Sequence, residues 1–591
     1  MKRTEQLVEN TWNLEKIFKD RADFDKSSLK ALKLAKKIAR FKGKLSNEDN
    51  LLESLKLYDE LGIESEKIAS YAYMKNSEDG TNTSNMELMN SYIALSTKVG
   101  ELIAFFISEI SAQDIDYLKS FTKRKDGRDY RVFINRIIRD KKHILSEKEE
   151  RLLSWEDEVG SVFSRCFDDL TDVDFDFGSV RDKKLTHASY SSFLQNDDIT
   201  VRKEAYYAYY KKYDETKSAI SKMYEGALRQ SAFKAKARGF KNTLAKSLYA
   251  DNVNESVFKN LIDVAHSATS ILERYYNLKK KALKQDKLYH YDVYMPLVKD
   301  YKTNIPYEKA VETVINALSV LGKEYTDVLE RGLTCERWVD RYENEGKASG
   351  AYSNGCYKTL PYILMSYKDD VLRDVFTLAH EGGHSMHSYY SARNNPFSSY
   401  NYSIFEAEVA STFNENVLYT YMIKNAKDER EKLYLETKRA DDIVATFFRQ
   451  TMFTEYEYIM HKRLNEGQSV TLNDMRKTYK DLLDLYLPGV TTDDTATLEA
   501  LRIPHFYRPF YVYKYATGIS AAVALSERVM NGGEKERNDY LSFLKSGGSH
   551  FPLDSLKKAG VDLKKKENFE YIVTLFEQIV SNLEDAFEQY N

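Results

Sequence analysis

The sequence predicts a mainly α-helical protein, and three observations predict this fold class. The 591 residues include only 8 prolines, helix-forming side chains are abundant, and apolar residues recur at three- and four-residue spacing over long stretches. Hydrophobic residues make up 42% and charged residues 30% of the chain, as in ordinary globular proteins. The length allows a large buried core and two to four domains of typical size.

The first elements expected are helices. Residues 25–115 are predicted to form a run of amphipathic helices, and a second, more charged helical stretch covers about 116–165. Between Asp169 and Ser191, apolar residues alternate with aspartates, which favours a short strand or hairpin. A boundary is expected near residue 195, because the polar residues 196–198 can cap the helix that follows.

Helical periodicity then continues to about residue 335. It breaks between Gly346 and Tyr367, where glycines and Pro361 interrupt β-prone stretches, so a small sheet is expected there. Helical patterns resume at Asp369 and Asp370, which are predicted to cap the next helix.

Charge and cysteine usage narrow the class of protein. The net charge is −3 without a basic stripe, which argues against a nucleic-acid partner. The three cysteines are far apart and form no CxxC pair, as expected in a reducing compartment. The N-terminus carries no secretory pattern and the apolar runs are too short to span a bilayer, so we expect a cytoplasmic protein without a membrane anchor.

The segment His380-Glu381-Gly382-Gly383-His384 is an HExxH motif within a predicted helix. Residues four apart on a helix share a face, with Cβ atoms about 5–6 Å apart. Two imidazoles placed in this way can bind one zinc ion. Glu381 is rotated by about 100° from His380, so it is predicted to act on the attacking water as a general base rather than as a ligand.

The residues around the motif limit its type. Gly382 and Gly383 each cost roughly 1 kcal/mol in a helix relative to alanine, which suggests that something approaches the helix closely there. His387 is too far along a straight helix to reach the same ion as His380, since seven residues rise roughly 10 Å. We predict that His387 either supports a metal ligand without binding the ion itself or serves only in packing. Positions 387 and 390 are His and Tyr, which excludes the metzincin pattern.

The third ligand is expected from the helix predicted at 401–415. Glu408 lies 24 residues after His384, a spacing that suits a two-His, one-Glu zinc site. Glu415 shares a face with Glu408 and can hold the tautomer of a ligating imidazole, although a structural carboxylate is an equal alternative. Glu406 points roughly the opposite way.

The sequence resembles oligoendopeptidase F, within the thimet oligopeptidase-like zinc peptidases. The resemblance extends over nearly the whole chain, and five segments carry it: 10–14, 375–390, 407–413, 502–507 and 510–518.

The resemblance implies two helical lobes around a deep substrate channel, with a zincin-type HExxH helix of the gluzincin class and a small β-sheet beside it. It divides the chain into an N-terminal helical region of the oligoendopeptidase F type, 1–195, and a zinc metallopeptidase catalytic domain, 196–591. One Zn²⁺ per chain is expected on His380, His384 and Glu408, with Glu381 as the base.

The same resemblance implies further site residues. His505 and Tyr513 are expected to donate hydrogen bonds to the oxyanion, with Tyr507 and Tyr511 as additional substrate-binding candidates. The segment Gly350, Ala351 and Tyr352 resembles the strand edge that pairs with the substrate backbone.

The function expected is hydrolysis of short, unfolded peptides by a zinc-dependent endopeptidase. Two alternatives stay open: a peptidyl-dipeptidase, and a non-catalytic peptide-binding helical protein with a structural zinc. Cobalt or manganese could occupy the same ligands. The sequence leaves open whether the protein is a monomer or a small homo-oligomer.

Overall fold

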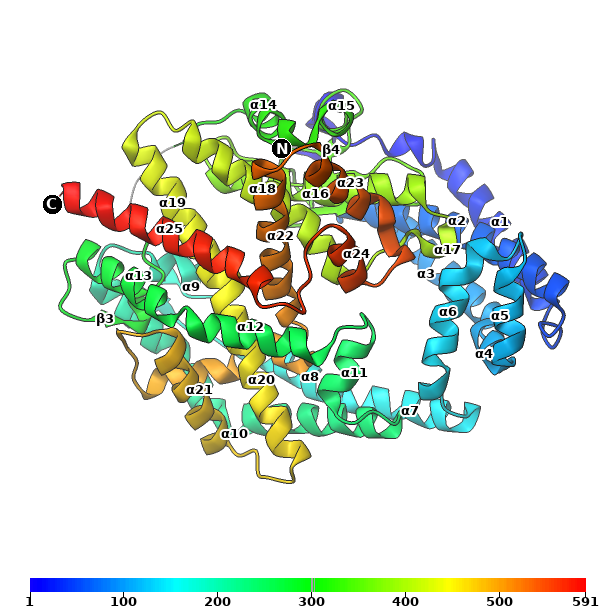
Figure 1. Ribbon diagram of the computed structural model, residues 1–591, viewed down its shortest axis with the longest axis horizontal. Coiled ribbons are helices and arrows are strands. Elements are labelled where there is room, and N and C mark those ends of the chain that lie inside the picture. The colour runs from blue at the N-terminus through cyan, green and yellow to red at the C-terminus, as the bar shows by residue number, and fades with distance from the viewer. Residues whose placement is uncertain (299–300, 302, 591) are drawn as a thin grey trace. The chain divides into compact units, whose positions relative to one another are not determined.

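The computed structural model describes residues 1–298, 301 and 303–590 of the chain. Most of the described residues are helical and the strands are short, which confirms the predicted fold class (Figure 1). The chain divides into two compact units that are discontinuous in sequence. Unit 1 comprises Met1–Lys142, Lys302–Tyr421 and Leu525–Val561, and unit 2 comprises His143–Tyr301, Met422–Ala524 and Asp562–Asn591. The division into 1–195 and 196–591 follows the chain instead, and it stays a prediction.

Unit 1 contains the N-terminal helices and the helix with the HExxH motif. Its helices are α1 (Arg21–Ala39), α2 (Glu48–Glu78), α3 (Thr83–Ile103), α4 (Phe105–Ala112), α5 (Ile115–Lys123), α6 (Arg131–Asp140), α14 (Tyr307–Ala317), α15 (Lys323–Leu333), α16 (Leu372–Asn394), α17 (Phe397–Tyr400), α18 (Ile404–Lys424, with its last residues in unit 2), α23 (Glu534–Ser546) and α24 (Pro552–Lys558).

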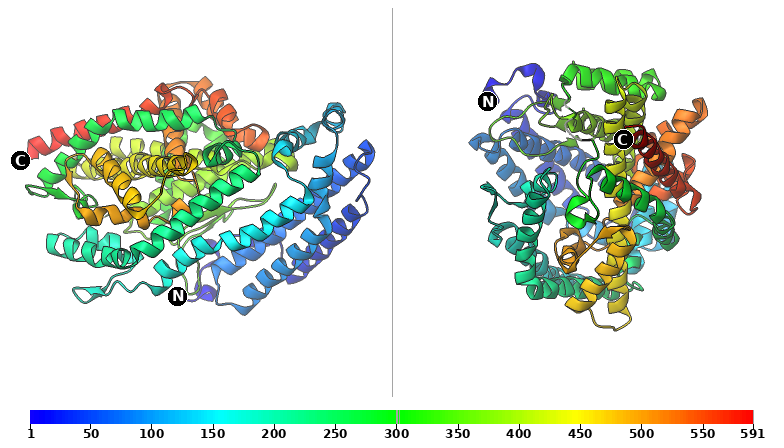
Figure 2. Two further views of the ribbon diagram at one scale, coloured as in Figure 1. Left: turned by 90° about the horizontal axis from the view of Figure 1, so that it is seen from below. Right: turned by 90° about the vertical axis from the view of Figure 1, so that its left-hand side faces the viewer.

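The helical run predicted at 25–115 is confirmed by α1 to α4, and α1, α2 and α3 pack side by side (Figure 2). Helix α1 begins where the Asp20 carboxylate accepts a hydrogen bond from the backbone N–H of Asp23. Phe24, Leu34 and Ile38 lie on one face of α1 and are buried in the core of unit 1.

The small sheet expected between Gly346 and Tyr367 is confirmed. It has the order β4-β6-β5, built from β4 (Val339–Asp340), β5 (Tyr352–Asn354) and β6 (Tyr362–Leu364). Strand β4 runs parallel to β6 and β5 runs antiparallel to it, so β5 is an edge strand.

The register of the sheet directs the backbone N–H and C=O groups of Ser353 in β5 toward the open edge. Ser353 lies opposite Ile363 on β6, and the N–H of Ile363 donates to the carbonyl of Trp338 beside β4. The peptide groups of one residue point to the same side of a strand, so Ser353 and Ile363 do not bond each other. The peptide groups of Ser353 therefore face away from the sheet.

The N-terminal segment packs against this sheet, close to β4 (Figure 1), where backbone hydrogen bonds join Asn10 to Arg341 and Asn13 to Arg337. The ring of Trp12 lies 6.4 Å from that of Tyr362 and its indole N–H donates to Glu78. The Arg3 guanidinium pairs with the buried carboxylate of Asp340. The segment 10–14 is thus part of the support of the sheet.

Unit 2 is also mainly helical. Its helices are α7 (Glu147–Gly160), α8 (Val162–Asp168), α9 (His187–Leu194), α10 (Ile199–Ala237), α11 (Thr243–Tyr249), α12 (Glu255–Ser267), α13 (Thr269–Ala282), α19 (Glu429–Ile443), α20 (Arg449–Asn465), α21 (Leu472–Tyr486), α22 (Tyr513–Asn531, with its last residues in unit 1) and α25 (Glu567–Tyr590).

Two short pairs of strands lie in unit 2: β1 (Ser179–Val180) with β2 (Lys183–Lys184), and β3 (Leu288–Tyr289) with β7 (Val490–Thr491). The β1–β2 hairpin confirms the hairpin expected between Asp169 and Ser191, but it lies after the alternating aspartates, which form a π-helical turn at Asp169–Asp174. The predicted cap at 196–198 is confirmed, because the Asp198 carboxylate caps α10.

A buried ion network lies in the core of unit 2. Glu499 pairs with Arg449 and Arg502 at 2.7 and 3.0 Å, and Tyr479 donates to its other oxygen. Although burial raises the pKa of Glu499, the two guanidinium groups lower it well below its usual range. His290 lies 3.8 Å from Glu499, and burial lowers its pKa to about 4.

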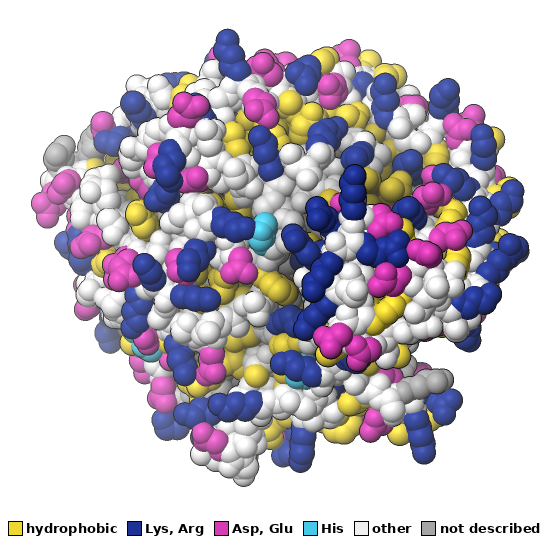
Figure 3. All heavy atoms as spheres, turned by 45° about the vertical axis from the view of Figure 1, so that its right-hand side comes forward, with side chains coloured by type: hydrophobic (Ala, Val, Ile, Leu, Met, Phe, Trp, Pro, Cys, Tyr) yellow, Lys and Arg dark blue, Asp and Glu magenta, His cyan; other side chains and the backbone are white. Residues whose placement is uncertain are grey.

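Acidic and basic side chains are interspersed over most of the face shown in Figure 3. Of the helices in the described part of the chain, none carries an apolar stretch long enough to cross a lipid bilayer. The three cysteines are free, with Cys166 and Cys335 exposed and Cys356 buried.

Candidate active site

Helix α16 positions the HExxH motif in its middle turns. The predicted cap at Asp369 and Asp370 is wrong, since the helix begins at Leu372 after Val371, and no side chain caps that end. The carboxylate of Asp374 instead folds back and accepts from the N–H of Lys368. The two aspartates lie within the turn that precedes the helix, closed by the bond from the N–H of Val371 to the carbonyl of Lys368.

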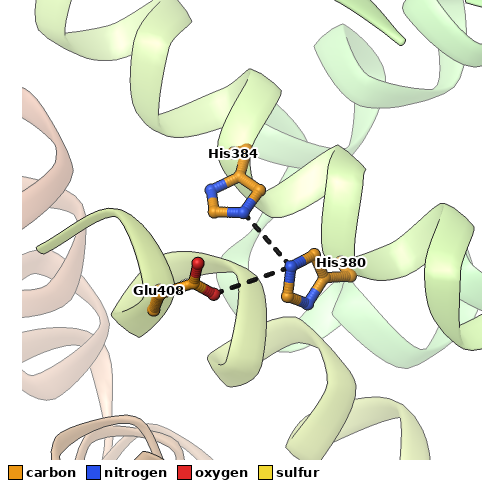
Figure 4. A group of neighbouring side chains, drawn as sticks. All are labelled: His380, His384 and Glu408. Atoms are coloured by element: carbon orange, nitrogen blue, oxygen red, sulfur yellow. Dashed lines mark hydrogen bonds and ion pairs between the residues drawn. The ribbon is translucent and has the colours of Figure 1, made fainter. Parts of the chain in front are cut away.

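His380, His384 and Glu408 converge on one point (Figure 4). The two imidazole Nε2 atoms are 3.2 Å apart, and Nε2 of His380 lies 3.7 Å from Oε2 of Glu408. One donor atom from each residue lies within 4.8 Å of the other two. Donors around a tetrahedral zinc, each about 2.0–2.1 Å from it, lie roughly 3.3 Å apart. The spacing of the cluster therefore fits a single ion of this size.

The closeness of α16 and α18 depends on Gly383. A Cβ atom at this position would lie 2.6 Å from the carbonyl oxygen of Ala410 and 2.7 Å from the Cα of Ser411. Both are backbone atoms of α18, the helix that supplies Glu408. At Gly382 the nearest atom is a methyl group of Leu329, at 3.3 Å. The close approach expected at the two glycines is thus made by backbone at Gly383.

The hydrogen bonds of the two imidazoles fix their tautomers. Nδ1 of His380 lies 3.0 Å from Oε1 of Glu415, and because a carboxylate only accepts, Nδ1 carries the proton. The backbone of Ala407 accepts a hydrogen bond from His384. When both imidazoles are neutral, their Nε2 lone pairs face each other at 3.2 Å, which is favourable only with a cation between them. The donor set thus suits a metal ion.

The electrostatics of the cluster also favour a cation. Burial alone lowers the pKa of His380, but the Glu415 hydrogen bond and the charges of Glu415, Glu381 and Glu408 raise it to about 9. Burial and the neighbouring His380 lower the pKa of His384 to about 3. Three carboxylates therefore create a negative potential at His380.

Glu381 lies beside the cluster and is 6% exposed. Burial raises its pKa to about 7, with His380 opposing and Glu408 and Glu415 adding to the shift. Its carboxylate accepts a hydrogen bond from the backbone of Ser353, on the open edge of β5. A carboxyl group that titrates near neutral pH can both accept and return a proton.

Ser353 and Ser385 link the edge strand to the metal helix. Their hydroxyl oxygens are 2.8 Å apart, and Ser385 is fully buried next to His384 in the chain. Neither residue was predicted from the sequence. No local signal identifies them, because the contact depends on how β5 lies along α16.

His387 is buried, and its ring stacks on that of Tyr402 with centroids 3.6 Å apart. Neither ring nitrogen has a hydrogen-bond partner among the described residues. Burial lowers its pKa to about 3, so the ring is neutral at ordinary pH. The ring bonds no metal ligand among the described residues, so of the two alternatives for His387 this geometry is that of packing.

The predicted substrate-edge residues lie at the start of β5. Gly350 has a φ of +86°, a left-handed conformation that glycine adopts without strain, and a Cβ there would meet open space. Tyr352 is the first residue of the strand, and its ring lies 5.4 Å from that of Tyr73. Ala351 joins the turn to the strand.

The candidates of the C-terminal segment all belong to unit 2, whereas the two imidazoles belong to unit 1. His505 is in a 3-10 helix (Pro504–Tyr507) and its ring lies 6.1 Å from Tyr511 and 6.3 Å from Tyr515. Burial and the charge of Arg508 lower the pKa of His505, which favours the neutral ring.

Two other tyrosines of this segment are packed in the core of unit 2. Tyr507 stacks on Phe167 with centroids 4.7 Å apart. Tyr513 is fully buried, with its ring 6.0 Å from that of Phe258, and burial raises its pKa. Tyr511 and Tyr515 are therefore the tyrosines near His505, and Tyr515 was not among the predicted residues.

Family models match two parts of the chain. The model described as Peptidase family M3 matches residues 192–574, and the model described as Oligopeptidase F matches residues 109–177.

Curated relatives and a solved structure extend over nearly the whole chain. An oligoendopeptidase F homolog of Borreliella burgdorferi is 40% identical, covering 99% of this chain and 100% of its own. Oligopeptidase PepF of Bacillus subtilis is 38% identical, covering 99% of this chain and 88% of its own. The crystal structure of oligoendopeptidase-F from Enterococcus faecium matches with a TM-score of 0.73 at 30% identity, covering 96% of this chain and 99% of that one.

Proposed function

Because this chain belongs to peptidase family M3, we propose that it is a zinc-dependent endopeptidase of the oligoendopeptidase F type that cuts short, unfolded peptides. The chain is a metallopeptidase that hydrolyses peptide bonds. The observation that carries the finer proposal is the convergence of His380, His384 and Glu408 beside the buried carboxyl group of Glu381. A predicted channel that excludes folded proteins and a cytoplasmic location remain parts of the proposal.

His380, His384 and Glu408 would hold one zinc ion per chain. The support is the spacing of their donor atoms, the facing Nε2 lone pairs and the negative potential around them. Zinc bound there would make a coordinated water more acidic and polarise the scissile carbonyl. Glu415 would keep His380 in the tautomer that presents Nε2.

Glu381 acts as the base in this proposal. Its carboxylate accepts a proton from the attacking water and returns it to the nitrogen of the leaving amine. The hydrogen bond from the backbone of Ser353 holds the carboxylate between the metal ligands and the edge strand. A substrate strand added along β5 at Gly350, Ala351 and Tyr352 would be recognised through its main chain, which allows many sequences to bind.

The oxyanion needs neutral hydrogen-bond donors, and we propose His505 and Tyr513 for this role, with Tyr507 and Tyr511 as further substrate contacts. The support is the family resemblance together with the lowered pKa of His505, which keeps an N–H available without a charge. Single Tyr→Phe variants at 507, 511, 513 and 515 compare the four candidates directly.

The proposal is tested by digesting a ladder of peptides of increasing length, with and without a chelator, and reading the cut positions by mass spectrometry. An endopeptidase cuts peptides with free and amidated C-termini equally, and a peptidyl-dipeptidase needs the free carboxylate. Loss of all cleavage with chelator and its return with zinc are expected.

The variant Glu381→Gln tests the base. Zinc content should remain, and kcat should fall by about 10²-fold or more, because a general base is lost. Glu406→Gln is the matched control, since Glu406 is a buried glutamate near the start of α18 whose oxygen accepts from Ser403. Hydrolysis by Glu381→Gln at the rate of the control would remove Glu381 from the mechanism.

A further inference from the structure

A cavity of about 230 Å³ lies within unit 1, where the chain leaving β5 meets helix α16. Gly355 and Cys356 form one wall directly after the strand. Ser388 and Ala392 of α16 form a second wall, and Tyr400 and Tyr402, which precede α18, close a third.

The cavity lies further along the face of helix α16 that carries the two histidine ligands. Ser388 and Ala392 follow His380 and His384 at four-residue intervals, so all four side chains lie on one stripe of α16. At 1.5 Å per residue, Ser388 and Ala392 lie about 6 Å and 12 Å beyond His384 along the helix axis. The cavity is therefore beside the cluster, on the side of the C-terminal end of α16.

The edge strand leads to the same place. Ser353 contacts Ser385 and Glu381, and Gly355, two residues later, is in the wall of the cavity. A peptide added along β5 advances about 3.3 Å per residue, so it passes the cavity two or three residues from the bond that faces Glu381. Antiparallel pairs outnumber parallel ones and are slightly more stable, so the N-terminal part of the peptide runs toward Gly355.

The chemistry of the walls selects the side chain that fits. None of the described residues that line the cavity carries a formal charge. The hydroxyl group of Tyr400 donates to Glu66 at 2.5 Å, and that of Tyr402 bonds Ser388 at 2.7 Å, so both hydroxyl groups already have protein partners. A charged side chain would lose its hydration there and meet no opposite formal charge among the described lining residues.

We propose that this cavity is a specificity subsite that binds a large, uncharged aromatic or aliphatic side chain two or three residues N-terminal to the scissile bond. The inference rests on the proposed endopeptidase function, because it places a substrate along β5.

The test compares internally quenched peptides that differ only at these two positions, each carrying Phe, Leu, Gly, Lys or Glu. The wild-type protein should cleave the Phe and Leu peptides with a kcat/KM about tenfold or more above that of the Gly peptide, as expected for burial of a large apolar side chain. Lys and Glu peptides should not exceed the Gly peptide. Equal values across the series, a preference for Lys or Glu, or a preference only C-terminal to the cut would overturn the proposal.

Filling the cavity gives a second measurement. Ala392→Phe should reduce the ratio of kcat/KM for the Phe peptide to that for the Gly peptide to about twofold or less. Asn394→Phe is the matched control, because Asn394 is exposed on the same helix and is absent from the cavity wall. An unchanged ratio in a folded Ala392→Phe protein would overturn the proposal, and the wild-type series decides the question if that variant does not fold.

The two proposals fail in different ways. If no peptide of the series is cleaved, with or without added zinc, the proposed function fails. If every peptide is cleaved at the same rate, the function stands and the subsite is wrong.

Discussion

Replacing Gly383 by alanine gives a sharp test of how the two metal-bearing helices pack. Helix propensity alone predicts that Gly→Ala in a helix interior stabilises the protein by about 1 kcal/mol. The structure predicts the opposite, because the new Cβ would lie 2.6 Å from the carbonyl oxygen of Ala410 and 2.7 Å from the Cα of Ser411. Neither backbone atom can rotate away, so the helices must separate.

The size of the effect follows from these distances. An ordinary contact for a Cβ begins near 3.4 Å, so α18 must move by roughly 0.8 Å from the 2.6 Å position, and overpacking of this kind costs about 1–3 kcal/mol. The shift carries Glu408 away from the imidazoles, and metal sites tolerate only about 0.2 Å in ligand distances. We expect a lower urea midpoint of unfolding and a zinc affinity reduced by about tenfold or more.

Gly382→Ala is the matched control. Its Cβ would lie 3.3 Å from a methyl group of Leu329, a side chain that can shift by a few tenths of an ångström. That variant should be as stable as the wild type or slightly more so, with unchanged zinc affinity. Equal urea midpoints and equal zinc affinities for the two variants, measured by chelator competition, would refute the packing argument.

Three further predictions concern the metal and the pH dependence of stability. Glu415→Gln removes the charge that pairs with Nδ1 of His380, so zinc affinity in a chelator competition should fall about 10–100-fold, and an unchanged affinity would show that Glu415 does not tune the ligand. Removing the metal with a chelator should lower the melting temperature, and adding zinc should restore it, since a ligand that binds only the folded state stabilises that state. A melting temperature that is the same with and without metal would argue against a preformed site. His290, whose pKa burial lowers from 6.5 to about 4, stays unprotonated in the folded protein where the unfolded chain binds a proton. Its contribution to stability is therefore present above about pH 6.5 and is lost as the pH falls toward 4, so the urea midpoint should fall over this window, and His290→Gln should flatten that part of the profile.

Local geometry made much of the candidate site predictable from sequence. Spacings of four and seven residues decide which side chains share a helix face whatever the surroundings, which is why His380 with His384, and Glu408 with Glu415, could be paired in advance. The two glycines of the motif indicated that another segment approaches this helix closely, because glycine destabilises a helix interior relative to alanine. The mainly helical fold and the small sheet before α16 followed from periodicity in the same way.

Two elements predicted from weaker local signals begin later along the chain than those signals indicated. Apolar residues alternating with aspartates favoured a short strand or hairpin between Asp169 and Ser191, but Asp169–Asp174 form a π-helical turn and the hairpin follows it. Asp369 and Asp370 are good capping residues, yet α16 begins at Leu372 without a side-chain cap. Capping residues and alternation fix an element only when packing agrees with them.

The sequence by itself determined the donor types, their faces and the family. Only the tertiary structure decided that the backbone of α18 fills the space beside Gly383, that Ser353 of the edge strand bonds Glu381, and that Tyr511 rather than Tyr513 lies near His505. The reason is physical: a helix face is set by a repeat of a few residues, whereas contacts between segments distant in the chain depend on how whole elements pack against one another.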